Sequence, residues 1–221
     1  MRNKLIIAAA LLATSTLACA TTQPPGLIPI SASKAALLHK VHGFVWGQKT
    51  APAKAIVFFD PNCLWCHRFF EQVQEGVKEG KARYLMIPVA ILKKSSLAKA
   101  ERILQSKDPQ ATFLRDEQGF NENTEEGDLP KTFPKVRKPI ADMTAINTAV
   151  LADLDEGGKP ATPTFVVTTP QGPALHEGFV STPQAIKDKK LLSFQPNKEP
   201  QVPVPPVVHY GKIPAIPKVK E

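Results

Sequence analysis

The sequence predicts an α/β domain in which two cysteines lie between a buried strand and the helix that follows it. Residues 55–59 (AIVFF) form a short apolar run rich in branched and aromatic side chains, as expected of a core strand. Apolar residues recur every four positions over 69–77, which favours a helix that Gly80 can end. Residues 83–89 then predict a second strand, at the spacing of a parallel strand–helix–strand unit.

Cys63 and Cys66 stand where that strand turns into the helix. Residues 60–62 (DPN) predict a turn, because Pro61 fixes its own φ and biases the preceding residue away from the helical region. The cysteines then fall in the first helical turn, where their spacing allows a small-ring disulfide. Unpaired N–H groups and the positive end of the helix dipole favour an anion there. We therefore expect Cys63, at the exposed end, to be a nucleophile of lowered pKa and Cys66 to be the resolving thiol.

The first 20 residues predict a signal peptide rather than part of the fold. Two basic residues precede the apolar run 5–13, and residues 18–20 (ACA) fit a small-x-small cleavage site. The apolar run is too short to span a membrane. Lipidation of Cys19 is the alternative, but a polar residue stands three positions before it where an aliphatic one is expected. Cleavage would leave two cysteines, both in the motif, which indicates redox or cofactor chemistry in an exported chain.

Composition predicts one globular domain of modest size. About 200 mature residues can bury an adequate core without disulfides. The chain of 221 residues has a formal net charge of +8, but its lysines are scattered and its aromatic residues are few. Nucleic-acid binding is therefore not expected, and a basic face in an anionic envelope is the favoured interpretation.

The elements between the amino terminus and residue 156 follow from caps and chain breaks. Residues 21–40 predict a loose lead-in, and residues 41–46 (VHGFVW) predict a first strand. Residues 93–156 predict a helical insertion. The first helix is expected to be capped by Ser95 or Ser96, and the second to start at Asp108-Pro109. The third is expected to be capped by Asp142, and its inward-facing residues are Met143, Ile146, Val150 and Leu154.

The carboxyl-terminal part predicts two strands, a helix and a tail. Residues 161–167 form an apolar strand pattern after Thr-Pro, and residues 174–179 are its expected hairpin partner. Residues 182–192 predict a last helix that starts at Thr-Pro. Residues 195–221 are rich in proline, so they predict an extended or disordered tail that is either solvated or docked on a partner.

The cysteine pair permits three chemistries. Residues 63–67 (CLWCH) match the attachment pattern of c-type haem. In this chain, however, a predicted core strand leads straight into the cysteines, which is not typical of c-type cytochromes. Zinc would need a second ligand pair, which His39 and His42 could supply, although His42 lies in or beside a predicted strand. Thiol–disulfide exchange needs a turn, a helix amino terminus and two thiols. We therefore expect redox exchange, with no metal and no cofactor.

The order of elements resembles the thioredoxin fold. More narrowly, four segments are similar to the catalytic domain of the periplasmic DsbC/DsbG disulfide isomerases, and to DsbG-type members above all: residues 59–66 (FDPNCLWC), 83–92, 106–109 (SKDP) and 161–163 (ATP). The resemblance covers roughly residues 41–194. It implies a thioredoxin-like α/β fold with a helical insertion, about 93–156, between its βαβ and ββα halves.

The resemblance also implies a function. Cys63 and Cys66 would form a redox-active disulfide, and Pro163 would be a cis proline that, with Thr162, presents a loop to the substrate chain. The chain would be a periplasmic thiol:disulfide oxidoreductase or isomerase. It would act on unfolded or disulfide-bearing exported proteins and be recharged by a membrane redox partner.

Two departures from the family pattern affect these expectations. Between the cysteines, Leu64 and Trp65 stand where the family commonly has a dipeptide that contains proline. Together with His67 they are expected to set how strongly the Cys63 thiolate is favoured, and thereby the redox potential. The family's amino-terminal dimerisation domain has no counterpart in the short segment before residue 41, so we expect a monomer. A non-enzymatic alternative is a chaperone or scaffold that uses the surface around Trp65 and the Pro-rich tail.

Overall fold

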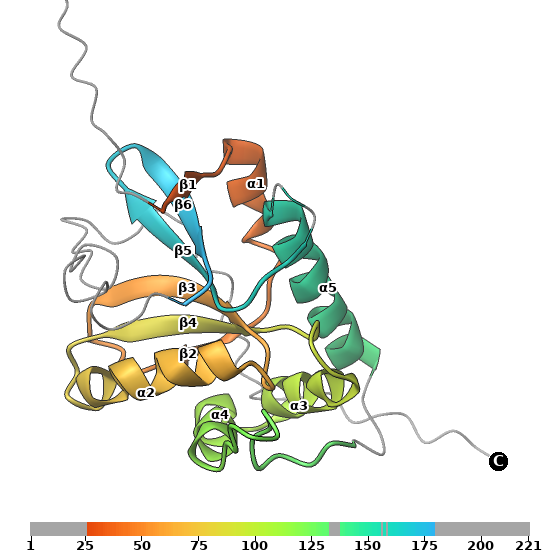
Figure 1. Ribbon diagram of the computed structural model, residues 1–221. Helices are drawn as coiled ribbons and strands as arrows, with labels where there is room; N and C mark the ends of the chain where they lie inside the picture. The colour runs from red at the N-terminus through yellow and green to blue at the C-terminus, as the bar shows by residue number, and fades with distance from the viewer. Residues whose placement is uncertain (1–25, 133–137, 156, 158, 180–221) are drawn as a thin grey trace, which may run out of the picture.

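The computed structural model describes residues 26–132, 138–155, 157 and 159–179. The predicted signal peptide, last helix and Pro-rich tail lie outside these residues. A six-stranded mixed sheet has the order β1-β6-β5-β3-β4-β2 (Figure 1). The strands are β1 (Ile28–Pro29), β2 (Phe44–Trp46), β3 (Ala53–Phe59), β4 (Arg83–Pro88), β5 (Thr164–Thr169) and β6 (Gly172–Glu177). The helices are α1 (Ala32–Leu37), α2 (Leu64–Lys78), α3 (Lys94–Gln105), α4 (Pro109–Gln118) and α5 (Lys138–Leu154).

The predicted strand–helix–strand unit is confirmed as β3–α2–β4. β3 pairs with β4 in parallel, with Val57 opposite Met86, and β5 flanks β3 on its other side in antiparallel orientation. Helix α2 ends at Lys78, and Gly80 adopts a positive φ of 74° just beyond it, a conformation that glycine reaches without a Cβ penalty. The cysteine-bearing turn is therefore held by the central strand of the sheet.

Helices cover both faces of the sheet (Figure 1). Because side chains alternate along a strand, β3 sends Val57 and Phe59 into the core under α2 and α4, and sends Ile56 and Phe58 into the core under α1 and α5. The α2-side core is rich in aromatic side chains: Phe44, Trp46, Phe59, Phe69, Phe70, Tyr84, Phe113 and Phe165. None of the described helices is long and apolar enough to cross a membrane.

Over its described residues, the lead-in predicted for 21–40 is part of the domain. β1 pairs with the edge of β6, with Ile28 opposite Leu175, and Leu38 after α1 is fully buried. The strand predicted for 41–46 is reduced to β2, which pairs with β4 rather than with β3. The strand is shorter than predicted because the Asn147 side chain bonds the backbone of His42: it accepts from the His42 N–H (2.7 Å) and donates to the His42 carbonyl (2.8 Å). A side chain there satisfies the backbone groups that a strand partner would otherwise bond.

The helical insertion forms α3, α4 and α5, and two of the predicted starts are corrected. Asp108 caps α4 as predicted, since its carboxylate accepts from the Ala111 N–H (2.9 Å). Helix α3 begins at Lys94, before both predicted caps, and Ser96 accepts from the Lys93 N–H (3.0 Å) from inside the first turn. Helix α5 begins at Lys138, four residues before Asp142.

The inward face of α5 also differs from the prediction. Ile146 is 38% exposed, although it was expected to face inward. The buried positions are Ile140, Thr144, Asn147, Val150, Leu151 and Leu154. Two of these positions are polar, and both side chains find backbone partners. The Thr144 hydroxyl donates to the Ile140 carbonyl within the helix, and the Asn147 amide donates to the carbonyls of His42 and Pro88. The prediction is confirmed for Val150 and Leu154 and is wrong for Ile146, because an apolar pattern does not include the buried polar positions.

Candidate active site

Cys63 is the N-cap of α2, and Cys66 lies one turn further along. The Cys63 sulfur accepts a hydrogen bond from the Cys66 N–H (3.2 Å), and its thiol lies 3.2 Å from the carbonyl oxygen of Thr162. Both cysteines are free thiols and each is 3% exposed. The expectation of an exposed Cys63 is therefore wrong, because the loop that carries Thr162 lies directly against its sulfur.

The two thiols differ in acidity. The hydrogen bond with the Cys66 side chain lowers the pKa of Cys63, and together with the Thr162 side chain and the Cys66 backbone N–H it outweighs burial and the negative charge of Asp60. Burial raises the pKa of Cys66 well above its ordinary value, and the bond to Cys63 adds to this. A proton is therefore lost first from Cys63, as the position of the thiol at the helix amino terminus predicts.

The loop before β5 lies beside the thiol pair. The Thr162–Pro163 peptide bond is cis. The Pro163 carbonyl accepts from the Gly178 N–H (2.8 Å), and the Thr164 hydroxyl donates to the Ala161 carbonyl (2.8 Å). These bonds tie the loop to the end of β6 and hold the Thr162 carbonyl against Cys63. The substrate-binding role of Thr162 and Pro163 stays a prediction.

The residues between the cysteines have different environments. Leu64 is half-buried, whereas Trp65 is 56% exposed. The Trp65 ring stacks on Phe179, with centroids 5.9 Å apart and planes at 21°. Phe179 directly follows Gly178, whose N–H anchors the cis-proline loop. An exposed aromatic surface therefore adjoins the redox pair, as expected for Trp65.

His67 is buried rather than solvated on the surface of α2. It is 7% exposed, its Nδ1 lies 2.9 Å from Glu117 Oε2, and its ring stacks on Phe120 with centroids 4.4 Å apart. Burial lowers the pKa of His67, but the hydrogen bond and charge of Glu117 outweigh it, so the pKa is raised. Glu117 and Phe120 belong to the insertion and were not singled out from the sequence.

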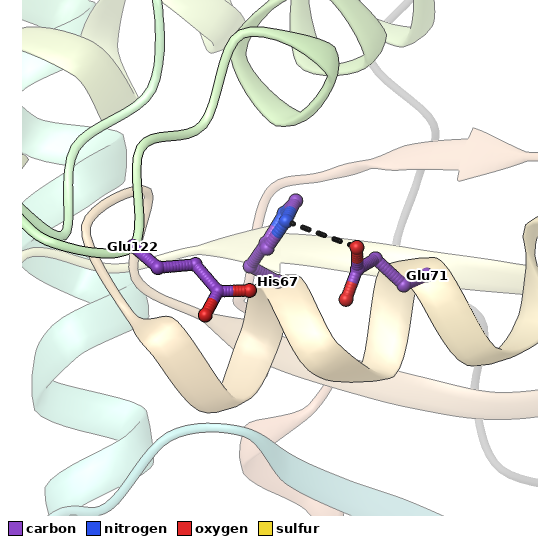
Figure 2. Close-up of side chains that lie close together, drawn as sticks. All are labelled: His67, Glu71 and Glu122. Carbon is purple, nitrogen blue, oxygen red and sulfur yellow. Dashed lines mark ion pairs between the residues drawn. The ribbon is translucent and has the colours of Figure 1, made fainter.

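A group of possible metal ligands lies on the outer side of His67. The ligand atoms of His67, Glu71 and Glu122 lie within 4.8 Å of one another, and Figure 2 shows both carboxylates beside the imidazole. Arg68 already pairs with both, at 3.3 Å from Glu71 and 2.5 Å from Glu122. A metal would have to displace this guanidinium. The zinc alternative fails on geometry, since within the described ranges His39 and His42 do not converge with the two cysteines.

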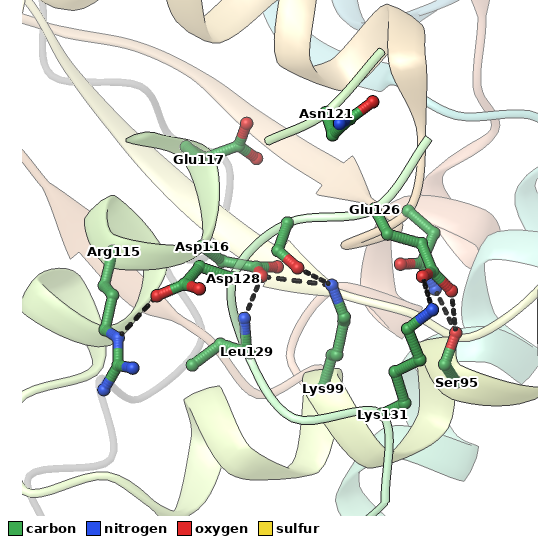
Figure 3. A network of polar contacts seen from close by, with 12 residues as sticks. Ser95, Lys99, Arg115, Asp116, Glu117, Asn121, Glu126, Asp128, Leu129 and Lys131 are labelled. Atoms are coloured by element: carbon green, nitrogen blue, oxygen red, sulfur yellow. Dashed lines mark hydrogen bonds and ion pairs between the residues drawn. The ribbon is translucent and has the colours of Figure 1, made fainter. Parts of the chain in front are cut away.

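The turn residues before Cys63 are more deeply buried than the sequence predicts. Asp60 and Asn62 are completely buried, although the sequence predicts only a turn. Asn62 donates to the Ser95 hydroxyl (3.0 Å), which in turn donates to Glu126 (3.1 Å), and Lys131 pairs with the same carboxylate (Figure 3). A polar pair that directly ends an apolar strand is the signal that could have indicated this buried junction.

The buried contact between Glu117 and His67 predicts a pH-dependent stability. Burial raises the pKa of Glu117 to about 7 from 4.5, although the bond to His67 opposes this. Both raised pKa values mean that the folded state binds more protons than the unfolded state, so stability falls as pH rises from about 4.5 to above 7. For Glu117 the loss amounts to roughly 3 kcal/mol. Glu117→Gln should remove most of it, as measured by urea unfolding between pH 5 and pH 8.

Glu71→Gln is the matched control for this experiment. Glu71 also lies near His67, at 3.7 Å from Nε2, but its side chain is 44% exposed. Water screens such a pair, so this variant should keep the pH dependence of the unmodified chain. Equal flattening of the pH profile by both substitutions would show that burial of Glu117 is not its cause.

Comparison with known proteins agrees with this geometry. The family model described as Thioredoxin matches residues 39–170, more than half of the chain. Thiol:disulfide interchange protein DsbG of Pseudomonas aeruginosa is 38% identical over 95 residues, which are 43% of this chain and 37% of that protein. DsbG of Escherichia coli is 37% identical over 76 residues, which are 34% of this chain and 31% of that protein. The matched segments thus span about a third of the length of these relatives.

A solved structure extends the similarity over more of the chain. The catalytic domain of Proteus mirabilis ScsC superimposes with a TM-score of 0.52 at 20% identity. The superposition covers 73% of this chain and 96% of that one. At this identity the likeness shows the fold alone.

Proposed function

The chain belongs to the thioredoxin family, and we propose that it is a thiol:disulfide oxidoreductase whose Cys63 and Cys66 exchange disulfides with exported proteins. One observation carries the proposal. A thiol of lowered pKa caps α2 beside the Thr162–Pro163 loop, while a second thiol of raised pKa lies one turn behind it. This asymmetry suits an attacking thiol and a resolving thiol, because the thiolate is the nucleophile in exchange.

The reaction proceeds through two exchanges. The Cys63 thiolate attacks one sulfur of a substrate disulfide, a new S–S bond forms, and the other substrate sulfur leaves as a thiolate that takes up a proton. Cys66 then loses its proton and attacks the Cys63 sulfur, which releases the second substrate thiol. The substrate gains two electrons and two protons, and Cys63 and Cys66 are left as a disulfide. Run in reverse, the same steps donate that disulfide to a substrate dithiol.

The setting of this activity is also part of the proposal. The leader pattern of residues 1–20 and the similarity to DsbG support a periplasmic protein that meets disulfide-bearing exported chains. A membrane redox partner would restore the pair after each turnover. The expected monomer can be checked by the mass of the protein in solution.

Equilibration with glutathione buffers tests the redox function. Thiol trapping followed by mass measurement should show Cys63 and Cys66 passing between dithiol and disulfide as one two-electron couple. A potential near about −120 to −180 mV would place the pair with oxidants and isomerases, and one near about −270 mV with reductants. A pair that fails to exchange with glutathione, or a protein that carries haem, would contradict the proposal.

The exposed Trp65–Phe179 stack supports a second candidate, a chaperone that holds unfolded chains without using its thiols. An aggregation assay with Cys63→Ala separates the two functions. Full protection of a cysteine-free client by this variant would favour the chaperone for that activity. It would leave disulfide exchange to be judged by the redox measurement.

A further inference from the structure

The Asp60 side chain is the most highly bonded polar group near the redox pair. It is completely buried, and its Oδ1 accepts from the Asn62 N–H (2.9 Å) and the Ser96 hydroxyl (2.7 Å). Its Oδ2 accepts from the N–H groups of Ile91 (2.8 Å) and Leu92 (3.0 Å). All four neighbours donate, which suits a carboxylate because it is an acceptor on both oxygens.

These donors come from three separate segments. Asn62 belongs to the turn before Cys63, Ile91 and Leu92 to the loop after β4, and Ser96 to the first turn of α3. A second link runs in parallel, since the Asn62 amide donates to both Ser95 (3.0 Å) and Ser96 (2.9 Å). The turn that carries Cys63 is thereby joined to the start of the helical insertion.

Asp60 also acts on Cys63 through its charge. It lies three residues before the thiol, and little water is present to screen it, because the Asp60 side chain is completely buried and Cys63 is only 3% exposed. The hydrogen bond with Cys66 lowers the pKa of Cys63, whereas the negative charge of Asp60 raises it. A nearby negative charge disfavours a thiolate.

We propose that Asp60 is a positioning residue that holds the Cys63 turn against the helical insertion and places a buried negative charge three residues before the Cys63 thiol. The inference rests on the proposed function of the pair. A negative charge near Cys63 destabilises its thiolate and therefore the reduced form of the pair. Asp60 should thus make the pair less oxidising than it would be without this charge. The insertion, through Ser96 and the β4–α3 loop, supplies the donors that hold this charge in place.

Asp60→Asn tests the charge with little change in shape. The amide oxygen can keep the Ile91 and Leu92 bonds and the amide nitrogen can donate to Ser96, which leaves the Asn62 N–H without its acceptor. We expect the rate of Cys63 alkylation by iodoacetamide, below the pKa of the thiol, to rise roughly three- to tenfold. The potential of the pair should become less negative.

Ser96→Ala is the matched control, since it removes the hydroxyl that bonds Asp60, the Asn62 amide and the Lys93 N–H, and leaves the Asp60 charge and its other three donors in place. It should lower the midpoint of thermal unfolding but leave the alkylation rate and the potential unchanged. An Asp60→Asn variant with unchanged alkylation, or a Ser96→Ala variant with the same increase, would overturn the proposal and make Asp60 a structural residue only.

A measurement on the unmodified chain covers the case in which Asp60→Asn does not fold. The carboxyl 13C resonance of Asp60 should shift with the same midpoint as ionisation of Cys63, and a resonance that ignores this ionisation overturns the proposal. Alkylation and resonance need no substrate, so they remain decisive if disulfide exchange fails. In that case the proposed function falls, while the effect of Asp60 on Cys63 is judged separately.

Discussion

Cys63→Ala is expected to reduce disulfide exchange to the uncatalysed background, because the variant lacks the sulfur that attacks the substrate. Cys66→Ala should instead accumulate a mixed disulfide between Cys63 and the substrate, since nothing resolves it from within the chain. Non-reducing electrophoresis and intact mass, after acid quenching with a disulfide-bearing peptide, would distinguish the two results.

The asymmetry of the two variants is the informative result. The thiol of Cys66 has a raised pKa and lies one helical turn behind Cys63, so it should form little mixed disulfide when it is the remaining cysteine. Mixed disulfide of equal amount in both variants would contradict the assigned roles. Far-ultraviolet circular dichroism of both variants should match that of the unmodified chain, because alanine is smaller than cysteine and each site loses one sulfur atom.

Lys99→Met is expected to have the largest effect on stability. Lys99 is completely buried in α3, and its Nζ donates to Asp116 (3.2 Å) and to the Gly127 carbonyl (2.8 Å), as Figure 3 shows. Asp116 also accepts from the Leu129 N–H (2.9 Å). Removing one partner of a buried pair leaves the other charge without compensation, so the free energy of unfolding should fall by about 3–5 kcal/mol.

Arg115→Met provides the matched control in the same part of the insertion. Arg115 pairs with Asp128 at 3.2 Å, but both side chains are more than half exposed. Such a pair contributes about 0–1 kcal/mol, so urea unfolding should show a small change for this variant. The double variant Lys99→Met, Asp116→Leu should recover much of the loss because no buried charge is left unpaired. Similar losses for the two single variants would contradict a special contribution of the buried pair.

Several features were predictable from local sequence patterns. Strand β3, the turn and helix α2 follow one another within 26 residues (Ala53–Lys78), and each has its own periodicity, cap or breaker. The lowered pKa of Cys63 has its largest cause in the hydrogen bond with Cys66, which the same patterns place in the same helical turn. The start of α4 at Asp108-Pro109 was predictable for the same reason, since a cap and its helix are neighbours in the chain.

The environment of the thiols was not predictable from these patterns. Cys63 is covered by Thr162, 99 residues away, and His67 is paired with Glu117, 50 residues away. The carboxylate of Asp60 gathers its donors from the next strand's loop and from α3. Such contacts have no period and no fixed spacing, because loop lengths can vary while the packed elements stay in place. Local pattern therefore places the cysteine pair on its strand and helix, and long-range packing sets its burial and its charged neighbours.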